Sequence, residues 1–257
     1  MPGPESRLES ALQGGEGVRL IPYLMAGYPS PAASVELGLD FAAAGAAAIE
    51  VGVPFSDPLA DGPVIQEVGQ AALNGGMTLE GALEIAHEIA ASGVPVVVMT
   101  YVNPVLALGA GRFAQQAARA GVAGVIVPDL PIDEAGPIAR CCREQLLDTV
   151  FLVAPTTGEA RTAQIVAQSR GFVYCVTLTG VTGGRAELAP DLEALLERVR
   201  RHSSIPIAAG FGISRPEHVR RLRGQADAAV IGSALMERVI RGEDAVGAFR
   251  DLVEAGR

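Results

Sequence analysis

Short apolar runs rich in β-branched residues alternate along the chain with segments in which apolar residues recur at helical spacing. This alternation predicts a parallel sheet in which a helix follows each strand and covers the sheet. A loop containing Gly or Pro follows each run, as expected where a strand gives way to a helix. We expect eight strands, over residues 20–25, 47–51, 94–101, 123–127, 149–153, 172–176, 205–209 and 227–231.

Eight successive strand–helix units favour an α/β fold, a single (β/α)8 TIM barrel. A doubly wound open sheet is the alternative, but it usually carries a Gly-rich phosphate-binding turn after its first strand, where this chain has only Ala26-Gly27-Tyr28-Pro29. The Gly-rich turns here follow the last three strands instead. Residues 6–13 predict a short helix that closes the N-terminal end of the barrel. Because no linker divides the chain, we expect residues 1–257 to form one domain.

Composition narrows the classes of function. The 257 residues are 49% hydrophobic and carry a formal net charge of −9. Since no basic patch interleaves with aromatic residues, nucleic acid is not an expected partner. No stretch reaches the roughly 20 apolar residues that span a bilayer, and the N-terminus lacks the pattern of a secretory signal, so we expect a cytoplasmic protein that binds no membrane. The three Cys lack metal-ligand spacing, and no metal site is expected.

The chain contains 20 Arg and no Lys. Schiff-base aldolases, enzymes that anchor pyridoxal phosphate and Walker-type P-loops each require a Lys. The chain alone therefore belongs to none of these classes. Any cleavage of a carbon–carbon bond by it must use acid/base chemistry, and we expect no cofactor in this chain.

Two acids stand at or near the end of the second expected strand. Glu50 lies among apolar neighbours at the strand end, where barrels place catalytic residues and where burial raises the pKa of a carboxylate. An ion pair with an Arg or an outward-facing side chain is the alternative. Asp61 follows in a loop with three prolines and also Asp57. Asp61 alternatively caps the helix expected to begin near Val64.

Glycine-rich turns mark the other side of the expected barrel rim. Residues 210–214 read Gly-Phe-Gly-Ile-Ser and residues 231–233 read Ile-Gly-Ser. Turns after the last two strands are where barrels bind phosphate through free backbone N–H groups, although ordinary tight turns also use Gly-x-Gly. The loop over residues 178–185 is Gly-rich and contains Thr, which is typical of a mobile lid, with an ordinary exposed loop as the alternative.

Residues 49–63, Ile-Glu-Val-Gly-Val-Pro-Phe-Ser-Asp-Pro-Leu-Ala-Asp-Gly-Pro, resemble the signature of the tryptophan synthase α chain family. The resemblance continues in order through residues 22–23, 26–27, 101–104, 128–131, 179–183, 210–214 and 232–233. It implies a lyase of tryptophan biosynthesis that cleaves indole-3-glycerol phosphate to indole and glyceraldehyde 3-phosphate. Two positions depart from the pattern: Tyr28 stands where many members have Asp, and Met99 where Leu is common. These departures bear on the rim and the pocket shape.

The resemblance also implies roles for individual residues. Glu50 matches the carboxylate that transfers the proton, and Asp61 matches the carboxylate that binds the indole N–H. Tyr174 matches a tyrosine near the catalytic acid, and Thr182 matches the lid residue that bonds the second carboxylate. The residues matching the indole pocket are Tyr23, Met99, Tyr101, Ile126, Leu152 and Phe211, and those matching the phosphate site are Gly183, Gly212, Gly232 and Ser233.

The same resemblance implies a partner, a pyridoxal-phosphate β subunit in an αββα complex, with Asp57 and residues 101–106 at the interface. Three other functions stay open from the sequence. The chain could be a lyase on the same barrel that acts without a partner, or another phosphate-binding barrel such as an isomerase of phosphoribosyl compounds. It could also be a subunit that binds a phosphate ligand only to regulate a partner. The reaction of such an isomerase would not require the pair of acids Glu50 and Asp61.

Overall fold

The computed structural model describes residues 6–14, 17–176, 191–210 and 212–257, and it contains a closed barrel of eight parallel strands in chain order. Backbone pairing of the first strand with the last closes the barrel, with Arg19 opposite Ala228 and Pro22 opposite Ile231. The predicted (β/α)8 fold is therefore confirmed. The strands are β1 (Arg19–Met25), β2 (Ile49–Gly52), β3 (Val96–Met99), β4 (Gly124–Ile126), β5 (Asp148–Val153), β6 (Val173–Val176), β7 (Ile207–Gly210) and β8 (Ala228–Ile231).

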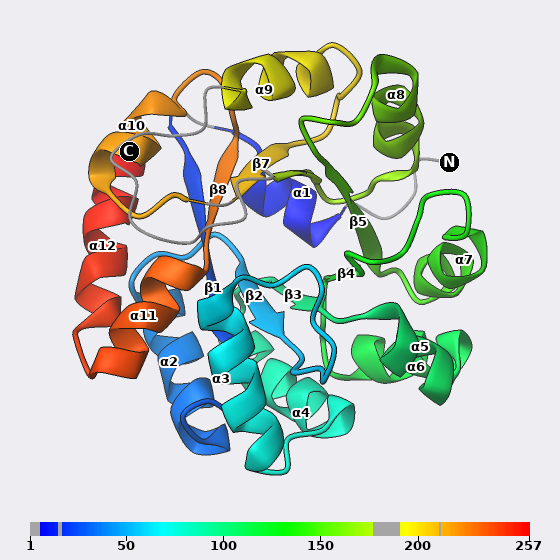
Figure 1. The fold of residues 1–257 in the computed structure, drawn as a ribbon. Coiled ribbons are helices and arrows are strands. Elements are labelled where there is room, and N and C mark those ends of the chain that lie inside the picture. The colour runs from blue at the N-terminus through cyan, green and yellow to red at the C-terminus, as the bar shows by residue number, and fades with distance from the viewer. Residues whose placement is uncertain (1–5, 15–16, 177–190, 211) are drawn as a thin grey trace.

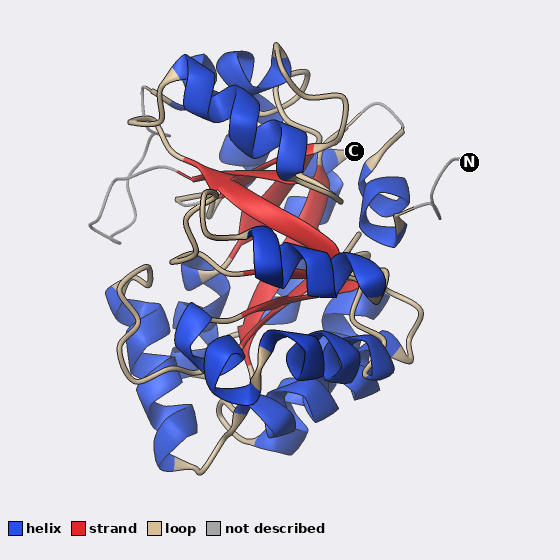
Figure 2. Cartoon of the chain, turned by 90° about the vertical axis from the view of Figure 1, so that its right-hand side faces the viewer, coloured by secondary structure: helices blue, strands red, loops and turns tan. Residues whose placement is uncertain are grey.

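Helices surround the barrel on its outside, as Figure 1 shows from one end and Figure 2 from the side. Several begin with sequence signals: Ser30 accepts the Ala33 N–H before Pro31, and Thr78 accepts the Gly81 N–H. The helices are α1 (Arg7–Leu12), α2 (Pro31–Ala43), α3 (Pro63–Asn74), α4 (Leu79–Ala90), α5 (Val102–Leu108), α6 (Ala110–Arg119), α7 (Gly136–Glu144), α8 (Glu159–Gln168), α9 (Leu192–Arg200), α10 (Pro216–Arg221), α11 (Ser233–Arg241) and α12 (Ala245–Gly256). Within the described residues, no helix is long and apolar enough to cross a membrane.

The short N-terminal helix α1 fills the barrel from its N-terminal end. Leu8 and Leu12 are buried in the same cluster as Ile21, Val97 and Phe172, which project into the barrel. Burying one such side chain contributes about 1.5–3 kcal/mol. The predicted helix at this end of the barrel is thus confirmed, two residues shorter than the predicted range of 6–13.

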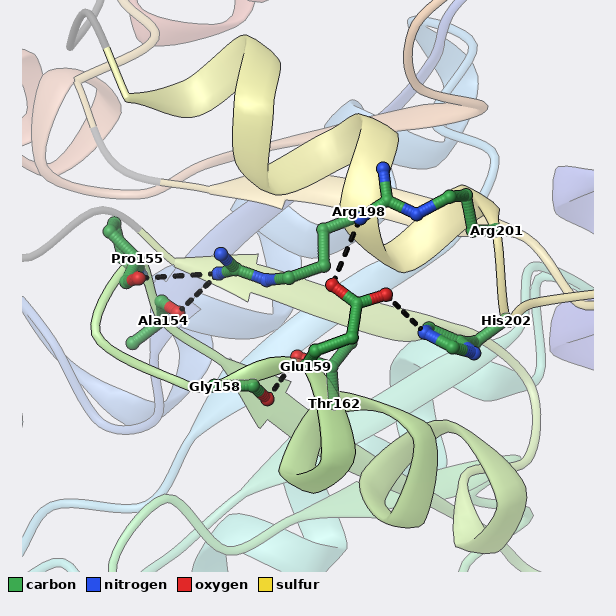
Figure 3. A network of polar contacts seen from close by, with 8 residues as sticks. All are labelled: Ala154, Pro155, Gly158, Glu159, Thr162, Arg198, Arg201 and His202. Atoms are coloured by element: carbon green, nitrogen blue, oxygen red, sulfur yellow. Dashed lines mark hydrogen bonds and ion pairs between the residues drawn. The ribbon is translucent and has the colours of Figure 1, made fainter.

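Polar side chains tie neighbouring outer helices together. Glu159 at the start of α8 accepts hydrogen bonds from Arg201, at 2.9 Å, and from His202, at 2.7 Å. Arg198 of α9 donates to the carbonyl groups of Ala154 and Pro155, just beyond β5 (Figure 3). Because exposed pairs contribute only about 0–1 kcal/mol each, this network chiefly fixes where α8 and α9 lie.

Candidate active site

Glu50 lies inside the barrel. It is the second residue of β2, opposite Tyr23 of β1 and Val97 of β3. Its side chain is 1% exposed, and its buried Oε2 atom has no hydrogen-bond partner among the described residues. An outward-facing side chain is therefore ruled out, and no ion pair to Glu50 occurs within the described part of the chain.

Burial shifts the protonation of Glu50. Loss of water around the buried carboxyl, and secondarily the nearby charge of Asp61, raise its pKa from 4.5 to about 8. A carboxyl with this pKa keeps its proton at neutral pH. Glu50 can therefore give a proton to a substrate and take one back within the same pH range.

Asp61 lies in the loop between β2 and α3, only partly covered by protein. Burial raises its pKa from 3.8 to about 6, and a hydrogen bond donated by the Tyr101 hydroxyl acts in the opposite direction. Asp61 is thus mostly ionised at neutral pH. It does not cap the following helix, because the N-cap of α3 is Gly62, which forms no side-chain cap hydrogen bond. The alternative interpretation of Asp61 as an N-cap is wrong.

Tyr101, the N-cap residue of α5, holds the loop that carries Asp61. Its hydroxyl accepts the Ala60 N–H at 3.1 Å and donates to the Asp61 carboxylate. Its ring stacks on Phe55, with ring centroids 5.0 Å apart. The loop from β2 is therefore fastened at both ends to a residue that follows β3.

Two more tyrosines approach the carboxylates from other strands. Tyr23 of β1 and Tyr174 of β6 are buried, and burial, followed by the charges of Glu50 and Asp61, raises the pKa of each hydroxyl. Two glycines make room for them. A Cβ on Gly52 would overlap the Tyr23 hydroxyl, and one on Gly210 would overlap the Tyr174 ring.

The other predicted pocket residues come from successive strands. Met99 ends β3, Ile126 ends β4 and Leu152 lies near the end of β5, and all three pack in the cluster that contains Tyr174. Tyr23 belongs to the neighbouring apolar cluster. Phe211, Thr182 and Gly183 lie outside the described residues.

The predicted phosphate residues other than Gly183 follow β7 and β8, which are paired strands. Gly212 has a φ of +79°, and a Cβ there would meet nothing within 4 Å. Gly232 is the N-cap of α11, and Ser233 is the first residue of that helix. The first N–H groups of a helix have no partner within it and favour an anion. Gly232 also lies beside Tyr23, because a Cβ on Gly232 would lie 3.5 Å from Cβ of Tyr23.

For two further residues near these strand ends, Asp129 and Thr100, the sequence predicted no individual role. Asp129 accepts the Val102 N–H at 2.9 Å and so holds the start of α5 beside the loop after β4. Its position between two prolines directly after an expected strand could have marked Asp129 as a residue of the barrel rim. Thr100 is 1% exposed, and its hydroxyl has no partner among the described residues. Nothing in its sequence context distinguishes it from an ordinary strand residue.

The described residues contain no group of three or more His, Cys, Asp or Glu side chains arranged to hold a metal ion. The described part of the site holds two carboxyl groups, Glu50 and Asp61, with the tyrosines Tyr23 and Tyr174 near them. Helix α11 begins at Ser233, directly after β8, which pairs with the strand that carries Tyr23. The family model described as "Tryptophan synthase alpha chain" matches residues 10–253. This chain belongs to the tryptophan synthase α chain family.

Known members of the tryptophan synthase α chain family resemble the chain over most of its length. The α chain of Halalkalibacterium halodurans is 46% identical over 241 residues, covering 93% of this chain and 90% of the relative. That of Roseiflexus castenholzii is 48% identical and covers 84% of each chain. A structure of Mycobacterium tuberculosis tryptophan synthase superimposes with a TM-score of 0.93 at 38% identity, covering 98% of each chain. The likeness therefore extends to the whole barrel.

Proposed function

We propose that this chain cleaves indole-3-glycerol phosphate into indole and glyceraldehyde 3-phosphate by acid/base chemistry, with Glu50 and Asp61 as its catalytic residues. Family membership supports the reaction. The observation that carries the residue assignment is the pair of carboxyl groups held at different pKa values, about 8 for Glu50 and about 6 for Asp61. Separated pKa values are typical of sites that use one acid and one ionised group.

Protonated Glu50 transfers its proton to C3 of the indole ring, which places a positive charge on the ring nitrogen. Ionised Asp61 accepts the ring N–H and stabilises that charge. The Glu50 carboxylate left by the first step then accepts the proton of the glycerol hydroxyl. As the aldehyde forms, the carbon–carbon bond breaks and its electrons return to the ring, so indole is released and Glu50 regains its proton. The reaction requires no oxidant and no Schiff base to an enzyme Lys, a residue that the chain lacks.

The remaining residues orient the substrate. Tyr23, Met99, Tyr101, Ile126, Leu152 and Phe211 line the indole pocket in this proposal, and Tyr174 lies near the acid. Gly183, Gly212, Gly232 and Ser233 bind the phosphate, and Thr182 bonds Asp61 when the loop closes. The apolar cluster that contains Met99, Ile126 and Leu152 supports the pocket assignment, because an indole site needs apolar walls with few polar groups.

The partner in this proposal is a pyridoxal-phosphate β subunit, which supplies the only cofactor of the complex. A related structure from Pyrococcus furiosus is described as a tryptophan synthase α2β2 complex, with a TM-score of 0.87 at 40% identity. Asp57 and residues 101–106 form the contact. Leu59 and Leu106 on these segments are 84% and 60% exposed, which supports a covered surface there. We also propose that residues 1–257 act as one domain in the cytoplasm.

Indole release from indole-3-glycerol phosphate tests the proposal, measured for the wild type and Glu50→Gln with and without the β subunit. We expect the wild type to release indole, faster with the β subunit, and kcat of the variant to fall at least about a hundredfold while substrate still binds. Equal inactivity of both proteins under both conditions would favour a phosphate-binding regulator. Loss of β-subunit binding and stimulation in Asp57→Ala is expected, and an unchanged response would refute the interface assignment.

A further inference from the structure

His218 is a buried imidazole that the proposed reaction does not use. It lies on α10, directly after the turn that follows β7, and its side chain is 2% exposed. Its Nδ1 atom accepts the backbone N–H of Ser214 at 3.3 Å. Its Nε2 atom is buried without a hydrogen-bond partner among the described residues.

Packing alone does not account for an imidazole at this position. Burial of a polar atom without a partner is unfavourable, and an aliphatic side chain would fill similar space without that penalty. Among the described residues, the one polar contact of the ring is the acceptor contact to Ser214. Because Nδ1 accepts, the neutral ring carries its hydrogen on Nε2. Within the described part of the chain, the polar contribution of His218 is therefore that of an acceptor for one backbone N–H.

That N–H belongs to the turn at the phosphate side of the site. Ile213, next to Ser214, is 2% exposed and anchored in the apolar core, while Gly212 before it is exposed with a φ of +79°. Ser214 precedes Arg215, the N-cap of α10, and its N–H binds back to a side chain within that helix. With Ile213 buried and the Ser214 N–H bonded to His218, the two residues that follow Gly212 are both held in place.

We propose that His218 is a positioning residue for phosphate binding: its Nδ1 atom holds Ser214 so that the Gly212 backbone keeps the geometry that receives the substrate phosphate. This inference rests on the proposed function, in which Gly212 binds phosphate. His218 itself touches no substrate. Its loss should weaken binding of the phosphate end and leave the proton transfers of Glu50 unchanged.

Three variants of the full chain test the proposal, assayed with the β subunit. His218→Asn keeps an acceptor near the position of Nδ1, His218→Gln carries the same amide one carbon further out, and His218→Leu has no acceptor. We expect the His218→Gln and His218→Leu variants to have a KM for indole-3-glycerol phosphate about three- to tenfold higher than the wild type, the factor that one hydrogen bond supplies. The Ki for inorganic phosphate as an inhibitor should rise by the same factor. The kcat of both variants should stay within about twofold of the wild type. The His218→Asn variant should keep the wild-type values of KM and Ki.

Unchanged KM and Ki in the His218→Gln and His218→Leu variants would overturn the proposal. A fall in kcat and thermal stability without a change in KM would overturn it as well, because either result leaves only a packing role for the ring. If His218→Leu does not fold, the Asn and Gln pair decides, since both are amides and differ in where the acceptor lies. If the wild type releases no indole, the proposed function fails. Calorimetric binding of inorganic phosphate to the same variants then tests His218 independently.

Discussion

Glu50 and Asp61 are both carboxylic acids near one end of the barrel, yet their surroundings hold them in different protonation states. Glu50 is enclosed by strands, whereas Asp61 lies on a loop and receives a hydrogen bond from Tyr101. The raised pKa of Glu50 was predictable from the apolar residues around it in the sequence. The Tyr101 contact was not, because these residues are 40 positions apart and meet only through the path of the loop.

The two pKa values predict a bell-shaped dependence of kcat/KM on pH. Activity needs Glu50 protonated and Asp61 ionised. It should therefore fall above about pH 8 as Glu50 loses its proton, and below about pH 6 as Asp61 gains one. Steady-state rates between pH 5 and 9 would measure both limbs. A residual activity in Asp61→Asn that still shows the acid limb would contradict the assignment of that limb to Asp61.

Tyr101→Phe should move the acid limb to higher pH, because the Tyr101 hydroxyl lowers the pKa of Asp61. The variant also leaves the Ala60 N–H without its acceptor, so we expect kcat to fall by about tenfold through a less ordered loop. Phe55→Leu is the matched control, since it removes the ring stack and keeps the hydroxyl. A pH profile that shifts equally in both variants would show that the hydroxyl has no specific effect on Asp61.

At the scale of elements, the hydrophobic pattern predicts each strand but not where it ends. The run over residues 94–101 contains β3 only from Val96 to Met99, because the chain then leaves the barrel and Tyr101 becomes the N-cap of α5. Strand ends depend on pairing with neighbours, which a pattern within one segment does not contain. Helix starts contain more local information, since the side chains of Ser30, Thr78 and Asp244 each accept the N–H three residues later. Asp61 shows that an acid before a helix does not by itself identify a cap.

Helix α1 should contribute strongly to stability despite its six residues, because it fills the barrel interior. Leu8 is fully buried, and Leu8→Ala should lower the free energy of unfolding by about 2–5 kcal/mol. Urea denaturation at fixed pH would measure the change. Leu39→Ala, at a position 40% exposed on α2, is the control and should change stability by less than about 0.5 kcal/mol. Similar small effects in both variants would mean that α1 is not part of the cooperative core.

At the scale of the molecule, the barrel brings together residues from all parts of the chain. Tyr23, Glu50, Tyr101 and Tyr174 come from four elements, and the closed strand order alone makes them neighbours. From the strand–helix pattern alone, only Glu50 was expected at the barrel rim. The places of Tyr23, Tyr101 and Tyr174 near it were implied by the family resemblance. The electrostatic coupling between Tyr23 and both acids required the coordinates, since it depends on how deeply each side chain is buried.

The exposed apolar residues predict which face of the barrel meets the β subunit. Leu106 is 60% exposed at the far end of α5 from Tyr101, so Leu106→Asp should weaken association by adding a charge to the proposed contact. Indole release by the isolated chain should stay within about twofold, because Leu106 is exposed and is not one of the proposed catalytic or substrate-binding residues. The β-subunit concentration that gives half-maximal stimulation should rise at least about tenfold. Leu146→Asp, at a position 69% exposed on the turn after α7, is the control for an added charge elsewhere. If both variants respond alike to the β subunit, the partner binds another face, and the exposure of Leu106 has a different cause.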